Sequence, residues 1–82
     1  MTKTFIDSPG SELLKMLENA KLNQSRFSRI IGVSPGCIND IIHGKRKITV
    51  STAKKIASFF KSTTTKYWLD RQTEFDLNRI HS

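Results

Sequence analysis

Three consecutive cations, Lys45, Arg46 and Lys47, carry the most evident chemistry in this sequence. Lysine and arginine neutralise the phosphates of a nucleic-acid backbone. Asn39 precedes them, and its side-chain amide is suited to pair with N6 and N7 of adenine. This combination predicts phosphate binding beside base recognition. The alternatives are a solvated loop for the cations and a solvated helix surface for Asn39.

Small and polar residues before these cations would share one side of a short helix and face DNA. Asp40 either accepts a hydrogen bond from a cytosine amine or pairs with a nearby Lys or Arg; we favour the ion pair or a role in specificity by repulsion. His43 either touches a base or phosphate or is an ordinary surface residue. The predicted DNA-facing residues of this segment are Ser34, Pro35, Gly36, Asn39, Asp40 and His43.

Nothing in the sequence predicts catalysis or metal binding. The two histidines and the single Cys37 lack the spacing of metal ligands. No serine, histidine and acid arrangement or carboxylate pair stands out, so we predict no catalytic residue, no metal, no cofactor and no enzymatic activity. Cys37 would lie near a helix N-terminus, where a thiol can act as a redox switch, but a small filler residue is the favoured interpretation.

The composition favours a polyanionic partner. The chain has 82 residues, and its 14 Lys and Arg against 7 Asp and Glu give a formal net charge of +7. Nucleic acid is the first candidate and an anionic membrane surface the second. A chain of this length predicts one small domain, whose stability would gain from dimerisation or a partner protein.

Membrane insertion and secretion find little support. No apolar run approaches the ~20 residues needed to span a bilayer. The N-terminal segment lacks the apolar core that a secretory signal has. A single cysteine cannot form an intramolecular disulfide, so we predict a cytoplasmic protein.

Residues 24–44 have the layout of a helix-turn-helix, in which the second helix is presented to the major groove of DNA. Two short segments with apolar residues at helical spacing meet at Gly32. Glycine permits the left-handed conformation that ends a helix. Ser34 and Pro35 then give a start signal, with serine as N-cap and proline as first helical residue. Phe27 and Ile38 would lock the two helices together.

Three further helices are predicted around this pair. The first runs from Pro9 to about Lys21, another follows a capping Thr49, and a C-terminal helix covers about residues 64–80. Residues 1–8 have no hydrophobic periodicity, and we predict that they form a flexible arm. Residues 9–82 then form a single domain. The expected fold is a compact all-α, five-helix domain.

The chain resembles the XRE/Cro superfamily of helix-turn-helix proteins and, within it, antitoxins of the HigA/VapI type. The resemblance covers roughly residues 8–77 and implies a lambda-repressor-like fold. It also implies a phosphate contact by Gln24, where a helix N-terminus adds its own N–H groups. Departures are Ser11, Ser28 and the pair Pro35–Gly36, and this pair leaves few long donors for base reading. The residues that carry the resemblance are Pro9–Gly10, Leu13, Leu14, Leu17, Gln24–Ser25, Gly32–Ser34, Ile38–Arg46, Ile48–Thr49, Thr52–Ala53, Ile56–Ala57 and Tyr67–Leu69.

What the resemblance implies is a homodimer that represses its own operon at a palindromic operator. The same protein would neutralise a cognate toxin of the HigB/RelE-like, mRNA-cleaving kind. A solitary Cro-like repressor without a toxin is the main alternative. An interaction adaptor or RNA binder that kept the fold without sequence readout is a third.

The C-terminal helix carries more apolar surface than one core requires. Adjacent residues of a helix point in different directions, so Tyr67, Trp68 and Leu69 need not all be buried. Phe75 follows Trp68 by one heptad and therefore falls on the same side of the helix. Core packing alone is one interpretation; we favour a homodimer or partner interface formed by Tyr67, Trp68, Leu69 and Phe75.

Overall fold

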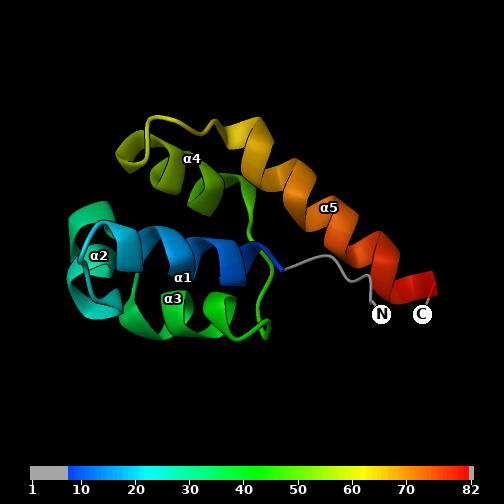
Figure 1. Ribbon diagram of the computed structural model, residues 1–82, viewed down its shortest axis with the longest axis horizontal. Helices are drawn as coiled ribbons and strands as arrows, with labels where there is room; N and C mark the ends of the chain where they lie inside the picture. The colour runs from blue at the N-terminus through cyan, green and yellow to red at the C-terminus, as the bar shows by residue number, and fades with distance from the viewer. Residues whose placement is uncertain (1–7, 82) are drawn as a thin grey trace.

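Five helices follow one another along residues 8–81, the part of the chain described by this computed structural model. Within these residues there is no strand, so the predicted all-α class is confirmed. The predicted N-terminal arm lies outside the described residues except for Ser8. The helices are α1 (Pro9–Asn19), α2 (Gln24–Ile31), α3 (Pro35–Ile42), α4 (Val50–Phe59) and α5 (Thr65–His81) (Figure 1).

Every helix begins at a side-chain oxygen that accepts a backbone N–H of the first turn. Ser34 Oγ accepts from the N–H of Cys37 at 3.2 Å, which starts α3 as predicted. For α5, Thr64 Oγ1 accepts from the N–H of Tyr67 at 3.0 Å. These caps satisfy donors that have no partner inside the helix. The residues that start α1, α2 and α4 in the same way are Ser8, Asn23 and Thr49.

Left-handed backbone ends two of the helices. Gly32 has φ 76° and stops α2, and Gly44 has φ 76° just after α3. Glycine adopts this conformation without a Cβ clash. The first helix is shorter than predicted: α1 ends at Asn19, and Lys21 takes φ 59° in the connection to α2.

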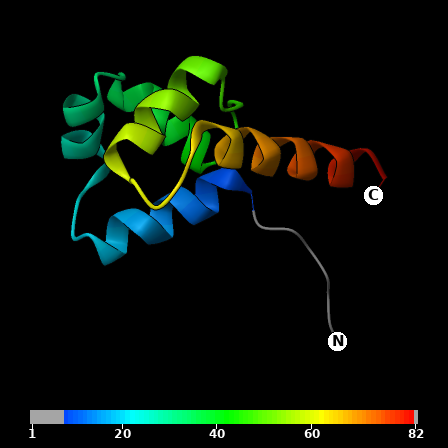
Figure 2. The same ribbon diagram turned by 90° about the horizontal axis from the view of Figure 1, so that it is seen from above.

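The helices enclose a single core. α1 and α2 both pack against α3, α2 also meets α4, and α5 covers α4 and α1. The C-terminal end of α5 extends past the other helices in both views (Figures 1 and 2). The buried apolar residues are Leu13, Leu17, Phe27, Ile38, Ile41, Ile42, Ile48, Ala53, Ile56 and Trp68.

Trp68 belongs to this core, which corrects its assignment to a dimer or partner interface. Its side chain is 0% exposed within the single chain. The indole Nε1–H donates to Thr63 Oγ1 at 2.9 Å, so the one polar group of the ring is also satisfied. A side chain enclosed on all sides by its own chain cannot touch a second subunit.

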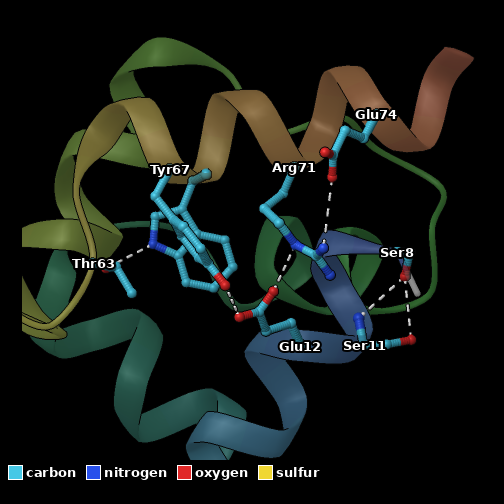
Figure 3. Close-up of polar contacts among 8 residues, drawn as sticks. Ser8, Ser11, Glu12, Thr63, Tyr67, Arg71 and Glu74 are labelled. Atoms are coloured by element: carbon cyan, nitrogen blue, oxygen red, sulfur yellow. Dashed lines mark hydrogen bonds and ion pairs between the residues drawn. The ribbon is translucent and has the colours of Figure 1, made fainter. Parts of the chain in front are cut away.

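Polar contacts fix α5 against α1 beside this ring. The hydroxyl of Tyr67 donates to Glu12, and the Arg71 guanidinium lies 2.7 Å from Glu12 Oε1 (Figure 3). The hydrogen bond to Glu12, followed by burial, raises the pKa of Tyr67. Because two residues of α5 converge on one carboxylate of α1, these contacts set the direction in which α5 leaves the core.

Gly10 marks the closest approach of α1 to α3. A Cβ on this residue would lie 2.0 Å from the carbonyl oxygen of Ile41 and 2.7 Å from Cα of Ile42. Both atoms are backbone and cannot rotate away. We expect Gly10→Ala to lower the free energy of unfolding by about 3 kcal/mol, because the two helices must separate.

Urea denaturation followed by circular dichroism measures this loss. Gly36→Ala is the matched control, since nothing lies within 4 Å of a Cβ there. A Gly10→Ala variant as stable as the parent chain would contradict the close α1–α3 approach.

Candidate DNA-binding surface

The predicted site residues gather on α2, α3 and the loop that follows α3. Gln24 is the first residue of α2, and Pro35 is the first of α3. Asn39, Asp40 and His43 follow along α3 or at its C-terminal cap, and the three cations 45–47 lie in the loop. All these side chains are exposed except those of Gln24 and Asp40, which are half-buried.

Gln24 and Asn39 form a hydrogen-bonded amide pair across the two helices. Asn39 Nδ2 donates to Gln24 Oε1 at 3.1 Å. With that oxygen occupied, Gln24 retains its Nε2 donors for a phosphate, while Asn39 retains Oδ1 and one N–H for a base. The sequence put both residues on one surface but gave no signal of the pairing, which depends on how α2 crosses α3.

The start of α3 presents few side-chain donors. Ser34 uses its oxygen to cap the helix, Pro35 has no N–H, and Gly36 has no side chain. Nothing lies within 4 Å of a Cβ built on Gly36, so its surroundings are open. The backbone of this tip is therefore free to approach a partner closely.

Asp40 is paired within the surface, as the favoured interpretation required. Its Oδ2 lies 3.5 Å from Nη2 of Arg46. Water reaches both side chains, which are 55% exposed for Arg46 and 39% exposed for Asp40, so the pair contributes little to stability. Its consequence is geometric: it draws the guanidinium of Arg46 toward α3.

Two other predicted residues have partners of their own. His43 Nδ1 donates to the carbonyl oxygen of Asn39 at 2.8 Å, because a carbonyl can only accept. This leaves Nε2 as the ring nitrogen available to a ligand. Lys47 Nζ lies 3.3 Å from Oδ2 of Asp76 on α5, a contact that the sequence did not predict.

The charge of the chain is concentrated around this surface. Residues 21–61 contain nine Lys or Arg and a single acid, Asp40. The acids Glu12, Glu18, Asp70, Glu74 and Asp76 lie on α1 and α5. The segment 21–61 is therefore strongly cationic, mainly through the loop after α3 and through α4, whereas α1 and α5 are close to neutral.

Comparison with known proteins decides the family. The helix-turn-helix family HTH_3 matches residues 13–68. The chain belongs to the helix-turn-helix family. This match spans the α2–α3 pair and the basic loop that carry the surface.

Two curated helix-turn-helix relatives are longer than this chain. Virulence-associated protein A' of Dichelobacter nodosus is 26% identical over 72 residues, which are 88% of this chain and 63% of the relative. An uncharacterised HTH-type transcriptional regulator of Haemophilus influenzae is 33% identical over 77% of this chain and 58% of its own length. The chain thus spans less than two thirds of either relative.

Solved helix-turn-helix structures share the whole fold. A putative antidote protein of a plasmid maintenance system from Nostoc punctiforme is 28% identical, with a TM-score of 0.89 over 94% of this chain and 84% of that one. An addiction module antidote protein of a HigA family from Coxiella burnetii is also 28% identical, with a TM-score of 0.83 over 90% and 80% of the two chains. PA4674 from Pseudomonas aeruginosa, solved with its operator DNA, is 25% identical, with a TM-score of 0.83 over 92% and 81%.

The predicted interface residues other than Trp68 are half-buried. Tyr67 and Leu69 pack partly on the core, whereas Phe75 lines the cavity beside residues 44–47. Leu77, farther along α5, is 52% exposed. These residues form a partly exposed apolar strip along α5.

Residues 8–78 contain no group of three or more His, Cys, Asp or Glu side chains placed to hold a metal ion. None of the described helices combines the length and apolarity required to cross a membrane. Cys37 is a half-buried free thiol on α3.

Proposed function

We propose that this chain binds operator DNA by placing α3 in the major groove. The observation that carries this proposal is the common surface of the Gln24–Asn39 pair and the cations Lys45 and Arg46. A helix tip with a small residue at Gly36 fits the groove, and the flanking cations fit the phosphates. PA4674, which shares the fold and was solved with its operator DNA, supports binding of operator DNA.

We further propose that the chain is the antitoxin of a type II toxin–antitoxin system. Support comes from the antidote proteins of Nostoc punctiforme and Coxiella burnetii, the second of the HigA family. The chain would neutralise a HigB/RelE-like, mRNA-cleaving toxin and repress its own operon. It would act in the cytoplasm by binding alone, without catalysis, with residues 9–82 as one DNA-binding domain.

A homodimer is the proposed DNA-binding form. Two-fold symmetry would set two copies of α3 about 34 Å apart, one DNA turn, on a palindromic operator. Tyr67, Leu69 and Phe75 are the proposed contacts, because they keep apolar surface on α5 after the core is complete.

Co-expression tests the antitoxin proposal. The small reading frame beside this gene is expressed with and without this chain while growth is followed. Toxicity that this chain relieves is the expected result. A harmless neighbour would leave the solitary Cro-like repressor, which the operator complex of PA4674 supports equally well.

Base reading and phosphate binding make separable predictions. Asn39→Ala is expected to weaken binding to the operator by ~1–3 kcal/mol and to leave random DNA almost unaffected. Lys45→Ala is expected to weaken both alike and to reduce the slope of log K against log salt by about 1.

Competition titrations of both variants at several salt concentrations measure this contrast. The parent chain should prefer its operator to random DNA by ~10³-fold or more. Equal losses on both sequences for Asn39→Ala would mean that this residue does not read a base. Equal affinity of the parent chain for both sequences would favour the adaptor or RNA-binding alternative.

A further inference from the structure

Polar contacts from α5 hold the second half of the loop between α3 and α4. A cavity of about 220 Å³ lies between this loop, the N-terminus of α1 and α5, and residues 44–47 line it. The loop passes beside the start of α1 on its way to α4 (Figure 1). Close packing is what normally fixes a segment in a protein. Residues 44–47 border a cavity and lack this packing on that side, so polar contacts matter more for their position.

Gln72 of α5 contacts the last part of the loop, close to the start of α4. Its Oε1 accepts a hydrogen bond from the backbone N–H of Ile48 at 3.0 Å. Ile48 is 3% exposed, so this bond joins a buried anchor to α5. This N–H belongs to the same planar peptide group as the carbonyl of Lys47. The hydrogen bond therefore fixes the orientation of the peptide group that follows Lys47.

Asp76, one turn farther along α5, completes the arrangement. Its Oδ1 accepts from Gln72 Nε2 at 3.0 Å, which turns Oε1 of Gln72 toward Ile48. Its Oδ2 lies 3.3 Å from Lys47 Nζ. The Lys47 side chain is 72% exposed, so the ammonium keeps donors for a further acceptor.

We propose that Gln72 is a positioning residue for DNA binding and presents Lys47 to a backbone phosphate. Lys47 is restrained at its backbone by Gln72 and at its ammonium by Asp76, and thus loses less conformational freedom when it binds. This inference rests on the proposed DNA-binding function. It adds that α5, which carries none of the predicted DNA-facing residues, sets the strength of the phosphate contact.

A double-mutant cycle tests the inference. Gln72→Met keeps the length of the side chain and removes both hydrogen bonds. Binding to a short mixed-sequence DNA duplex is measured over a range of salt for the parent chain, Gln72→Met, Lys47→Ala and the double variant. Thr73→Ala, an exposed neighbour on the same helix, is the matched control. Thermal melts of all variants show whether each one folds.

Gln72→Met is expected to weaken binding about threefold to tenfold and to reduce the salt slope by about 1. In the Lys47→Ala background the same change should cost less than about twofold, because the residue that Gln72 positions is gone. A similar loss in both backgrounds, or an unchanged salt slope with a lowered melting temperature, would overturn the inference. If the parent chain shows no salt-dependent binding, the proposed function fails as well.

Discussion

Replacing Trp68 with alanine is expected to lower the free energy of unfolding by about 3–5 kcal/mol. The indole is 0% exposed and is the largest fully buried side chain among the described residues. Its removal leaves a cavity between α5 and the remaining core, and Thr63 loses the hydrogen bond from Nε1. A domain of this size has a stability of the same order, so a large fraction of the variant should be unfolded.

Urea denaturation followed by circular dichroism measures this effect. Fluorescence is unsuitable, because Trp68 is the single tryptophan of the chain. Leu77→Ala serves as the control on the same helix, since Leu77 is 52% exposed and should change stability by no more than about 0.5 kcal/mol. A Trp68→Ala chain that folds with nearly full stability and loses only self-association would restore the interface interpretation.

Gly36→Glu is expected to weaken DNA binding at least about 100-fold while leaving the fold intact. The fold tolerates the side chain because nothing lies within 4 Å of a Cβ at this position. A carboxylate in the first turn of α3 also suits the positive end of the helix dipole. At the tip that enters the groove, however, the same charge opposes the phosphates, and like charges brought together cost several kcal/mol.

Three variants at this position separate charge from bulk. Gly36→Ala should retain affinity within about threefold and gain up to about 1 kcal/mol of stability, because glycine is a poor helix residue. Gly36→Gln adds the volume of glutamate without its charge. Titration of the parent chain and the three variants with the same duplex measures the effect. Full affinity of Gly36→Glu would mean that the tip of α3 does not face DNA.

Local features of the sequence were sufficient to place the helices. Three helices begin where a Ser or Thr side chain precedes apolar residues at helical spacing; these caps are Ser34, Thr49 and Thr64. Gly32 ends α2 in the left-handed conformation. Such signals act within one turn of backbone, so they can be read without knowledge of the fold. The end of α1 was less predictable, because Lys21 takes a positive φ that few non-glycine residues adopt.

The location of the candidate site also followed from the sequence. A run of cations directly after a second short helix can only lie beside that helix, whatever the remaining packing. The excess of positive charge in residues 21–61 is likewise a property of the printed sequence.

Contacts between distant segments were decided by the tertiary structure alone. Trp68 was assigned to an interface because sequence periodicity could not tell which of three adjacent apolar residues turns inward on α5. The Gln24–Asn39 pair depends on the crossing of α2 and α3, and the bond from Ile48 to Gln72 depends on the direction of α5. The sequence by itself thus determined the helices, their charge and the helix-turn-helix. Only the packing of those helices decided which side chains are buried and which partners orient the cations, because these distances are set by the whole core.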